Sequence, residues 1–140
     1  MATFLQRLGA RIDTNGSAKR MRRFREGWAR GGAGDIHFYE TAKVQYRYRT
    51  GGAGRTIVFM ADPPATVEHY DALLEVFSPR YRVIVFEAPG MGFSAARETY
   101  QFGFRETNDD IALFLRAVAG EGAILAFPCV GGLGAVDIAA

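Results

Sequence analysis

The sequence predicts an α/β fold, with a mostly parallel sheet, crossover helices, antiparallel first strands and a helical segment before them. Residues 56–60 and 81–86 are apolar runs without polar alternation, which is typical of parallel strands covered on both faces. Residues 67–77, between these runs, have apolar side chains at helical spacing. Strand, helix and strand in this order predict a right-handed parallel crossover.

The N-terminal part predicts a basic amphipathic helical extension over residues 1–34. Residues 1–30 contain eight Lys or Arg and two acidic residues, and Met21, Phe24 and Trp28 share one helical face. Such a segment most often packs on its own domain, but its charge also favours membrane surfaces, nucleic acid or an acidic partner. We expect no nucleic-acid ligand here. The glycines of residues 31–34 mark the boundary with a second unit, residues 35–140.

Composition restricts the class of protein. A chain of 140 residues that is 49% hydrophobic can form the core of one domain. Its one cysteine can form no internal disulfide or paired-cysteine zinc site, so we expect a cytoplasmic protein without a metal. No apolar stretch approaches the roughly 18 residues of a membrane span. Gly90 and Gly92 lack the third glycine of a dinucleotide fingerprint, so we expect no cofactor.

Other patterns complete the predicted sheet. Residues 35–42 and 43–50 read as an antiparallel strand pair, and the second of them alternates apolar and polar side chains. Residues 108–118 have helical spacing, with Asn108 or Thr107 as the expected N-cap.

The stretch around Cys129 predicts a strand-to-helix turn. The apolar run 123–127 leads into Cys129, and Gly131 and Gly132 follow without an intervening loop. A residue at so sharp a turn presents its side chain at the carboxyl edge of the sheet, beside the N–H groups of a helix N-terminus, which favours an anion. Cys129 is therefore a candidate nucleophile, and the alternative is a buried, inert thiol.

Three segments together resemble the α/β-hydrolase superfamily, over residues 35–140. Residues 60–64 (Met-Ala-Asp-Pro-Pro) stand where the family commonly has His-Gly-x-Pro. Residues 86–94 (Phe-Glu-Ala-Pro-Gly-Met-Gly-Phe-Ser) are similar to its Asp-x-x-Gly-x-Gly-x-Ser loop, with Glu87 as the acid. Residues 129–133 (Cys-Val-Gly-Gly-Leu) resemble the second half of its nucleophile elbow, with cysteine in place of serine.

The resemblance implies an acyl hydrolase or acyltransferase that acts on a small-molecule ester, lactone or thioester, with Cys129 as the nucleophile. The N–H of Val130 would stabilise the oxyanion. The second N–H would come from the loop after residues 56–60. Because Pro63 and Pro64 have no N–H, Asp62 is the expected donor.

The sequence also departs from the family pattern. Phe127 stands two residues before Cys129, where the elbow has a small residue. The family's acid and histidine follow the nucleophile, but the eleven residues after Cys129 contain no histidine, and His37 and His69 precede it. We therefore expect an N-terminal part of such a fold, truncated so that the catalytic histidine and acid are absent from this chain.

Truncation after the elbow has a structural consequence. The strand over residues 123–127 would become an exposed apolar edge, which favours pairing with a protein partner or a second copy. The alternative function is therefore a catalytically inactive fragment that acts as a binding or assembly module through its basic N-terminal helix.

Overall fold

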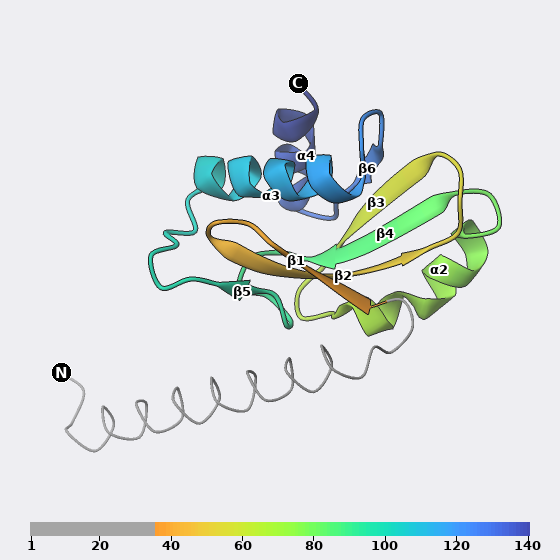
Figure 1. Ribbon diagram of the computed structural model, residues 1–140, viewed down its shortest axis with the longest axis horizontal. Coiled ribbons are helices and arrows are strands. Elements are labelled where there is room, and N and C mark those ends of the chain that lie inside the picture. The colour runs from red at the N-terminus through yellow and green to blue at the C-terminus, as the bar shows by residue number, and fades with distance from the viewer. Residues whose placement is uncertain (1–35) are drawn as a thin grey trace, which may run out of the picture. The chain divides into compact units, whose positions relative to one another are not determined.

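The computed structural model describes residues 36–140, so the predicted N-terminal helices lie outside the described residues. The described part contains a six-stranded sheet and helices on both of its faces (Figure 1). The elements in chain order are β1 (Ile36–Glu40), β2 (Val44–Gly51), β3 (Thr56–Ala61), the 3-10 helix η1 (Val67–Tyr70), α2 (Asp71–Phe77), β4 (Arg82–Glu87), β5 (Ala95–Ala96), α3 (Phe104–Val118), β6 (Ile124–Ala126) and α4 (Gly131–Ala139).

The sheet has the strand order β1-β2-β4-β3-β6, and the short β5 pairs with β2. Strands β3, β4 and β6 are parallel, whereas β1 and β2 form an antiparallel pair and β2 is antiparallel to β4. This topology confirms the predicted fold class, including its antiparallel first strands and the crossover from β3 to β4. Within the described part β6 is the terminal strand, as predicted.

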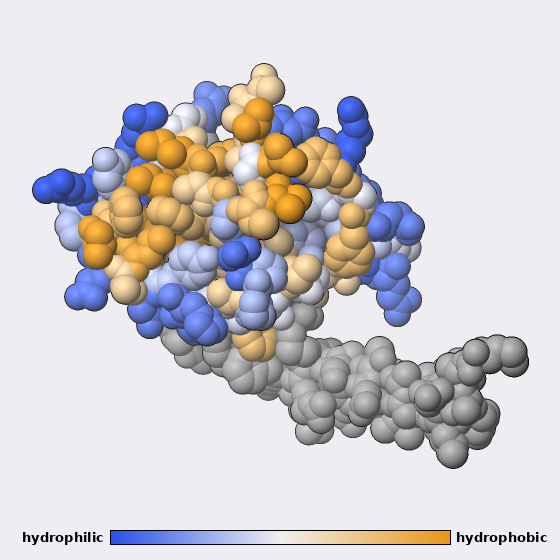
Figure 2. Space-filling view, turned by 180° about the vertical axis from the view of Figure 1, so that it is seen from behind, coloured by the Kyte–Doolittle hydropathy of each residue, from blue (hydrophilic) through white to orange (hydrophobic). Residues whose placement is uncertain are grey.

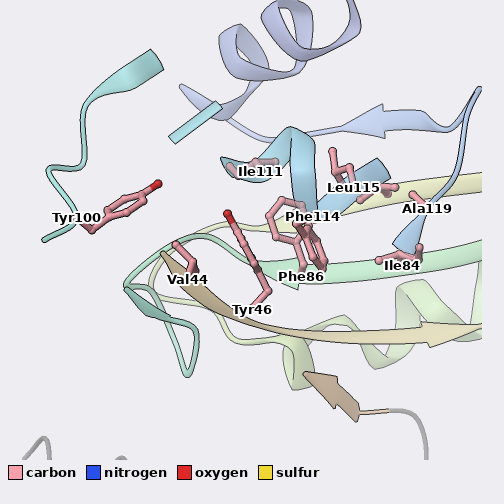
Figure 3. Close-up of a cluster of buried hydrophobic side chains, with 10 residues drawn as sticks. Val44, Tyr46, Ile84, Phe86, Tyr100, Ile111, Phe114, Leu115 and Ala119 are labelled. Carbon is pink, nitrogen blue, oxygen red and sulfur yellow. The ribbon is translucent and has the colours of Figure 1, made fainter. Parts of the chain in front are cut away.

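Strand β4 is covered on both faces, as its apolar sequence predicts. Val83 and Val85 pack in one core cluster with Leu74 of α2. Ile84 and Phe86 pack in a second cluster with side chains of α3 (Figure 3). Helices α3 and α4 lie on one side of the sheet and α2 on the other (Figure 1). Because successive strand residues point to opposite faces, a strand between two helical layers has no polar side.

The predicted start of α3 is wrong. The helix begins at Phe104 with Gly103 as its N-cap, so neither Thr107 nor Asn108 is the cap. Asn108 is buried instead, and its Nδ2 donates a hydrogen bond to Asp137 Oδ2 of α4 at 2.8 Å. A Cβ at Gly134 would lie 2.7 Å from Asn108 Oδ1. The buried amide therefore links α3 to α4 at a point where α4 tolerates only glycine.

The loop after β4 is held by the carboxylate of Glu87, which is fully buried. Its Oε2 accepts a hydrogen bond from the Phe93 N–H at 2.6 Å, and its Oε1 accepts from the Val67 N–H at 3.2 Å. Arg47 Nη1 donates to the same Oε1 at 2.9 Å. Glu87 is thus a structural residue that fixes the glycine-rich loop beside the start of η1.

Gly92 is expected to be intolerant of any side chain. It has a φ of 51°, and a Cβ there would lie 2.4 Å from Glu87 Cδ. We expect Gly92→Ala to cost about 1–2 kcal/mol for the left-handed backbone and about 1–3 kcal/mol more for the clash, because the carboxylate cannot move. Urea unfolding of the variant measures the loss.

Gly120→Ala is the matched control for this substitution. Gly120 also has a positive φ, 75°, but no atom lies within 4 Å of a Cβ built there. The loss of stability in Gly120→Ala therefore measures the cost of the left-handed backbone alone. Equal losses of stability in the two variants would contradict the role assigned to Glu87.

Candidate active site

The three segments that resemble the hydrolase motifs meet at one edge of the sheet. In the pairing of β3 with β6, Phe59 lies opposite Ala126, and Asp62 and Cys129 each follow these partners by three residues. In the pairing of β3 with β4, Ala61 lies opposite Glu87. Because the three strands are parallel, the segments after them leave the sheet at the same carboxyl edge.

Cys129 lies at a sharp turn between β6 and α4. It has a φ of 50° and its side chain is exposed. The turn is closed by a hydrogen bond from the Gly132 N–H to the Cys129 carbonyl at 3.1 Å. A non-glycine residue with positive φ is uncommon, and such strain concentrates at functional sites. The strand-turn-helix geometry agrees with the prediction, and the exposed side chain contradicts the alternative of a buried thiol.

The backbone strain at Cys129 can be measured. We expect Cys129→Gly to be more stable than Cys129→Ala by about 0.5–1 kcal/mol. The left-handed conformation costs a residue with a Cβ about 1–2 kcal/mol, which the glycine variant avoids. The larger conformational entropy of glycine in the unfolded chain offsets about 0.5–1 kcal/mol of that stabilisation. Both variants lack the thiol, so their urea midpoints compare backbone alone. A less stable glycine variant would show that the turn is not strained.

The two expected oxyanion donors differ in their surroundings. No residue of the described part accepts a hydrogen bond from the Val130 N–H, and Val130 is 67% exposed. The Asp62 N–H donates to Tyr70 Oη at 3.0 Å. The Val130 N–H is therefore available to a ligand, whereas the Asp62 N–H already has a partner.

The close crossing of β6 and α4 does not require a small residue at position 127. Phe127 packs edge-on against Phe86, with ring centroids 5.5 Å apart. The helix comes close to the strands at Gly131 instead, where a Cβ would lie 2.1 Å from Met60 Cε and 3.3 Å from Phe127 Cβ. Met60, which stands where the family has histidine, therefore fills the space beneath the start of α4.

Neither histidine is placed as a base for Cys129. His37 lies on β1, at the opposite end of the sheet from β6, and its ring contacts Tyr48. His69 Nδ1 accepts a hydrogen bond from the Thr66 N–H at 3.0 Å, which closes the first turn of η1. Residues 36–140 also contain no group of three or more acidic, histidine or cysteine side chains that could hold a metal ion.

An apolar cavity of about 310 Å³ lies beside the elbow. It is formed by the ends of β3, β4 and β6 and by the starts of α3 and α4. Its lining residues are Met60, Ala88, Phe102, Phe104, Thr107, Asn108, Ile111, Phe127, Val130, Gly131 and Gly134. The two residues that follow Cys129 thus form part of its wall, although Cys129 itself does not.

Two polar residues near the site were not identified from the sequence. Tyr70 contacts the Asp62 N–H, and no motif signals that role. Arg47 is fully buried, yet its place in an alternating strand is the same as that of Arg49. The sequence contains one signal for a buried cation, namely the acidic residue Glu87 in the glycine-rich motif.

Within residues 36–140, no helix has both the length and the apolar character needed to cross a membrane.

Solved structures with a similar fold are known. No family model and no curated protein matches the sequence. The structure is similar to the Cif epoxide hydrolase from Acinetobacter nosocomialis, with a TM-score of 0.67 and 18% identity over 86% of this chain and 40% of that one. It is also similar to a hydrolase from Pseudomonas aeruginosa, with a TM-score of 0.62 and 23% identity over 74% of this chain and 40% of that one.

This chain thus spans less than half the length of either structure. The similarity covers most of this chain. The chain therefore contains part of an α/β-hydrolase fold.

Proposed function

We propose that this chain is part of an acyl hydrolase or acyltransferase in which Cys129 is the nucleophile. The observation that carries the proposal is the exposed thiol of Cys129 in a left-handed conformation at the start of α4. In this proposal residues 35–140 form part of the catalytic domain and residues 1–34 a basic extension. The enzyme acts in the cytoplasm on a small-molecule substrate without a cofactor, and a lone thiol there stays reduced.

The expected chemistry is acyl transfer to sulfur. The Cys129 thiol gives its proton to a base, and its sulfur attacks the carbonyl carbon of an ester, lactone or thioester. The carbonyl oxygen becomes an oxyanion, which accepts a hydrogen bond from the Val130 N–H. The C–O or C–S bond to the leaving group then breaks and the leaving group takes up a proton. Water or another acceptor releases the acyl group from the sulfur.

The base is proposed to come from sequence outside this chain, because neither histidine contacts Cys129 in the described structure. Added imidazole should therefore speed release of an acetyl group from Cys129 after labelling with p-nitrophenyl acetate. Intact mass measures the acetylated fraction with time, and Cys129→Ala reports the background of imidazole alone. If Cys129 is never acetylated, with or without imidazole, the proposal is wrong.

Tyr70→Phe tests Asp62 as the second oxyanion donor. The substitution removes the hydroxyl that accepts from the Asp62 N–H and leaves the ring in place. If the freed N–H serves the oxyanion, the rate of Cys129 acylation should rise about tenfold, since one net hydrogen bond is worth about 1.4 kcal/mol. Tyr39→Phe, on β1, is the control and should not change the rate. An unchanged rate in Tyr70→Phe would exclude Asp62 as a donor.

A second candidate function is assembly through the free edge of the sheet. In the described part β6 pairs with β3 alone. Ile124 on β6 is 36% exposed, and Leu133 and Val136 on α4 are 66% and 71% exposed. Figure 2 shows an extended apolar area on one face of the described part. An open apolar edge favours pairing with a protein partner or a second copy.

Light scattering coupled to size exclusion tests this candidate. Ile124→Lys places a charge on the edge strand and should reduce self-association. Val76→Lys, on α2, changes an equally apolar side chain that is 71% exposed on the other side of the sheet. If both variants keep the wild-type mass, the edge is not an interface between copies.

A further inference from the structure

The apolar cavity beside the elbow is bordered by unusual backbone on two segments. Among residues 36–140, the non-glycine residues with a positive φ are Phe102, at 56°, and Cys129, at 50°. Phe102 lines the cavity, and Cys129 directly precedes Val130 and Gly131, which also line it. Strained residues persist where the surrounding structure holds them, and they cluster at ligand-binding and catalytic sites. The positive φ angles of Phe102 and Cys129 therefore indicate that this cavity is part of a ligand-binding or catalytic site.

Phe102 is held at the mouth of the cavity by its neighbours. Its ring lies edge-on to Tyr100, with centroids 4.8 Å apart. It also lies against the glycine-rich loop, because a Cβ at Gly90 would be 2.8 Å from Phe102 Cε1. The Phe102 side chain is nevertheless 57% exposed. A strained, half-exposed aromatic ring at the entrance of an apolar cavity is suited to contact an apolar ligand.

The wall of the cavity is mostly apolar and contains few polar side chains. Met60, Ile111 and Phe127 provide apolar side chains, and Thr107 and Asn108 provide the polar ones. The amide nitrogen of Asn108 is already bonded to Asp137. A volume of about 310 Å³ lies within the range of small-molecule sites, which combine apolar walls with a few polar groups.

The cavity is also in the right place for one part of a substrate. A carbonyl oxygen that accepts from the Val130 N–H has its substituents beside the start of α4. Gly131 and Gly134 line the cavity there, and neither carries a side chain. An apolar group attached to that carbonyl can therefore extend into the cavity without a clash from α4.

We propose that this cavity binds the apolar acyl group of the substrate, and that Phe102 at its mouth is a specificity-determining residue. The proposal rests on the proposed role of Cys129 and names the substrate class: esters or thioesters of apolar acids rather than of acetate. Each methylene that enters the cavity is expected to raise the rate of Cys129 acylation about fourfold.

Acylation rates with p-nitrophenyl acetate, butanoate, hexanoate and octanoate measure this dependence. Thr107→Trp places an indole in the cavity and should flatten the increase with chain length. Leu113→Trp, on the same helix, is the matched control, because Leu113 is 54% exposed and does not line the cavity. A chain-length dependence in Thr107→Trp equal to that of the control would overturn the proposal.

A binding experiment separates this proposal from the role of Cys129. With ¹³C-methyl methionine, 1-octanol should shift the Met60 signal and leave the Met91 signal unchanged, because Met60 lines the cavity and Met91 does not. Phe102→Ala should weaken the octanol affinity several-fold. An unshifted Met60 signal overturns the cavity assignment. A shifted Met60 with no acylation of Cys129 supports the cavity as an apolar ligand site and refutes the nucleophile.

Discussion

Replacing Arg47 with methionine is expected to destabilise the protein by about 3–5 kcal/mol. Arg47 and Glu87 are both fully buried, and Arg47 Nη1 donates to Glu87 Oε1 at 2.9 Å. Arg47 also forms an ion pair with Glu68. Methionine has a similar volume but no charge, so the variant leaves the Glu87 carboxylate buried without its cation. Urea unfolding at pH 7 measures the loss.

The loss in Arg47→Met should depend on pH. Burial raises the pKa of Glu87, and the Phe93 N–H and Arg47 oppose that rise. A group whose folded pKa is raised adds stability below its unfolded pKa, near 4.5, and this stability is lost as pH rises through the folded pKa. Without Arg47 the folded pKa of Glu87 rises further. The deficit of Arg47→Met should therefore be smaller at pH 4 than at pH 7.

Arg49→Met is the matched control from the same strand. Arg49 forms an ion pair with Asp71, whose side chain is 75% exposed, so we expect a loss of less than about 1 kcal/mol. A second variant, Glu87→Gln in the Arg47→Met background, removes the buried charge and should recover part of the stability. If Arg47→Met costs no more than Arg49→Met, the buried pair does not hold this fold together.

The second large effect is expected at Cys129. Cys129→Ala should abolish covalent acylation by p-nitrophenyl octanoate, because the sequence contains no other cysteine. Cys129→Ser should react about 10²–10⁴-fold more slowly than the wild type, since serine needs an adjacent general base and no histidine contacts this position. Intact mass after a fixed incubation measures both variants. Comparable labelling of the alanine variant would assign the acylation to lysine or tyrosine side chains.

The sequence predicts most of the sheet because its strands are short and their burial pattern is local. The uninterrupted apolar run of β4 signals cover on both faces, and the structure confirms this. The turn at Cys129 is predicted because a strand, a cysteine and two glycines follow one another without a loop. The structure adds that Cys129 has a left-handed φ of 50°.

The contacts that fix the site are not local, and the sequence does not predict them. Arg47 and Arg49 occupy equivalent places in an alternating strand, but Arg47 pairs with the buried Glu87, forty residues further along the chain, and Arg49 pairs with the exposed Asp71. Asn108 lies inside α3 rather than at its start, and its amide is paired with Asp137 of α4. Phe102, whose φ is 56°, likewise has its ring against Gly90, twelve residues earlier in the chain.

The rate at which Cys129 is acylated tests the central claim most directly. The second-order rate constant with p-nitrophenyl octanoate should be measured at pH 7 for the full chain, for the same chain unfolded in urea, and for N-acetylcysteinamide in the same urea concentration. If the elbow makes Cys129 a nucleophile, the folded chain should react at least about tenfold faster than the unfolded one, a difference of about 1.4 kcal/mol in the barrier. A folded chain that reacts no faster than the unfolded chain would contradict the account.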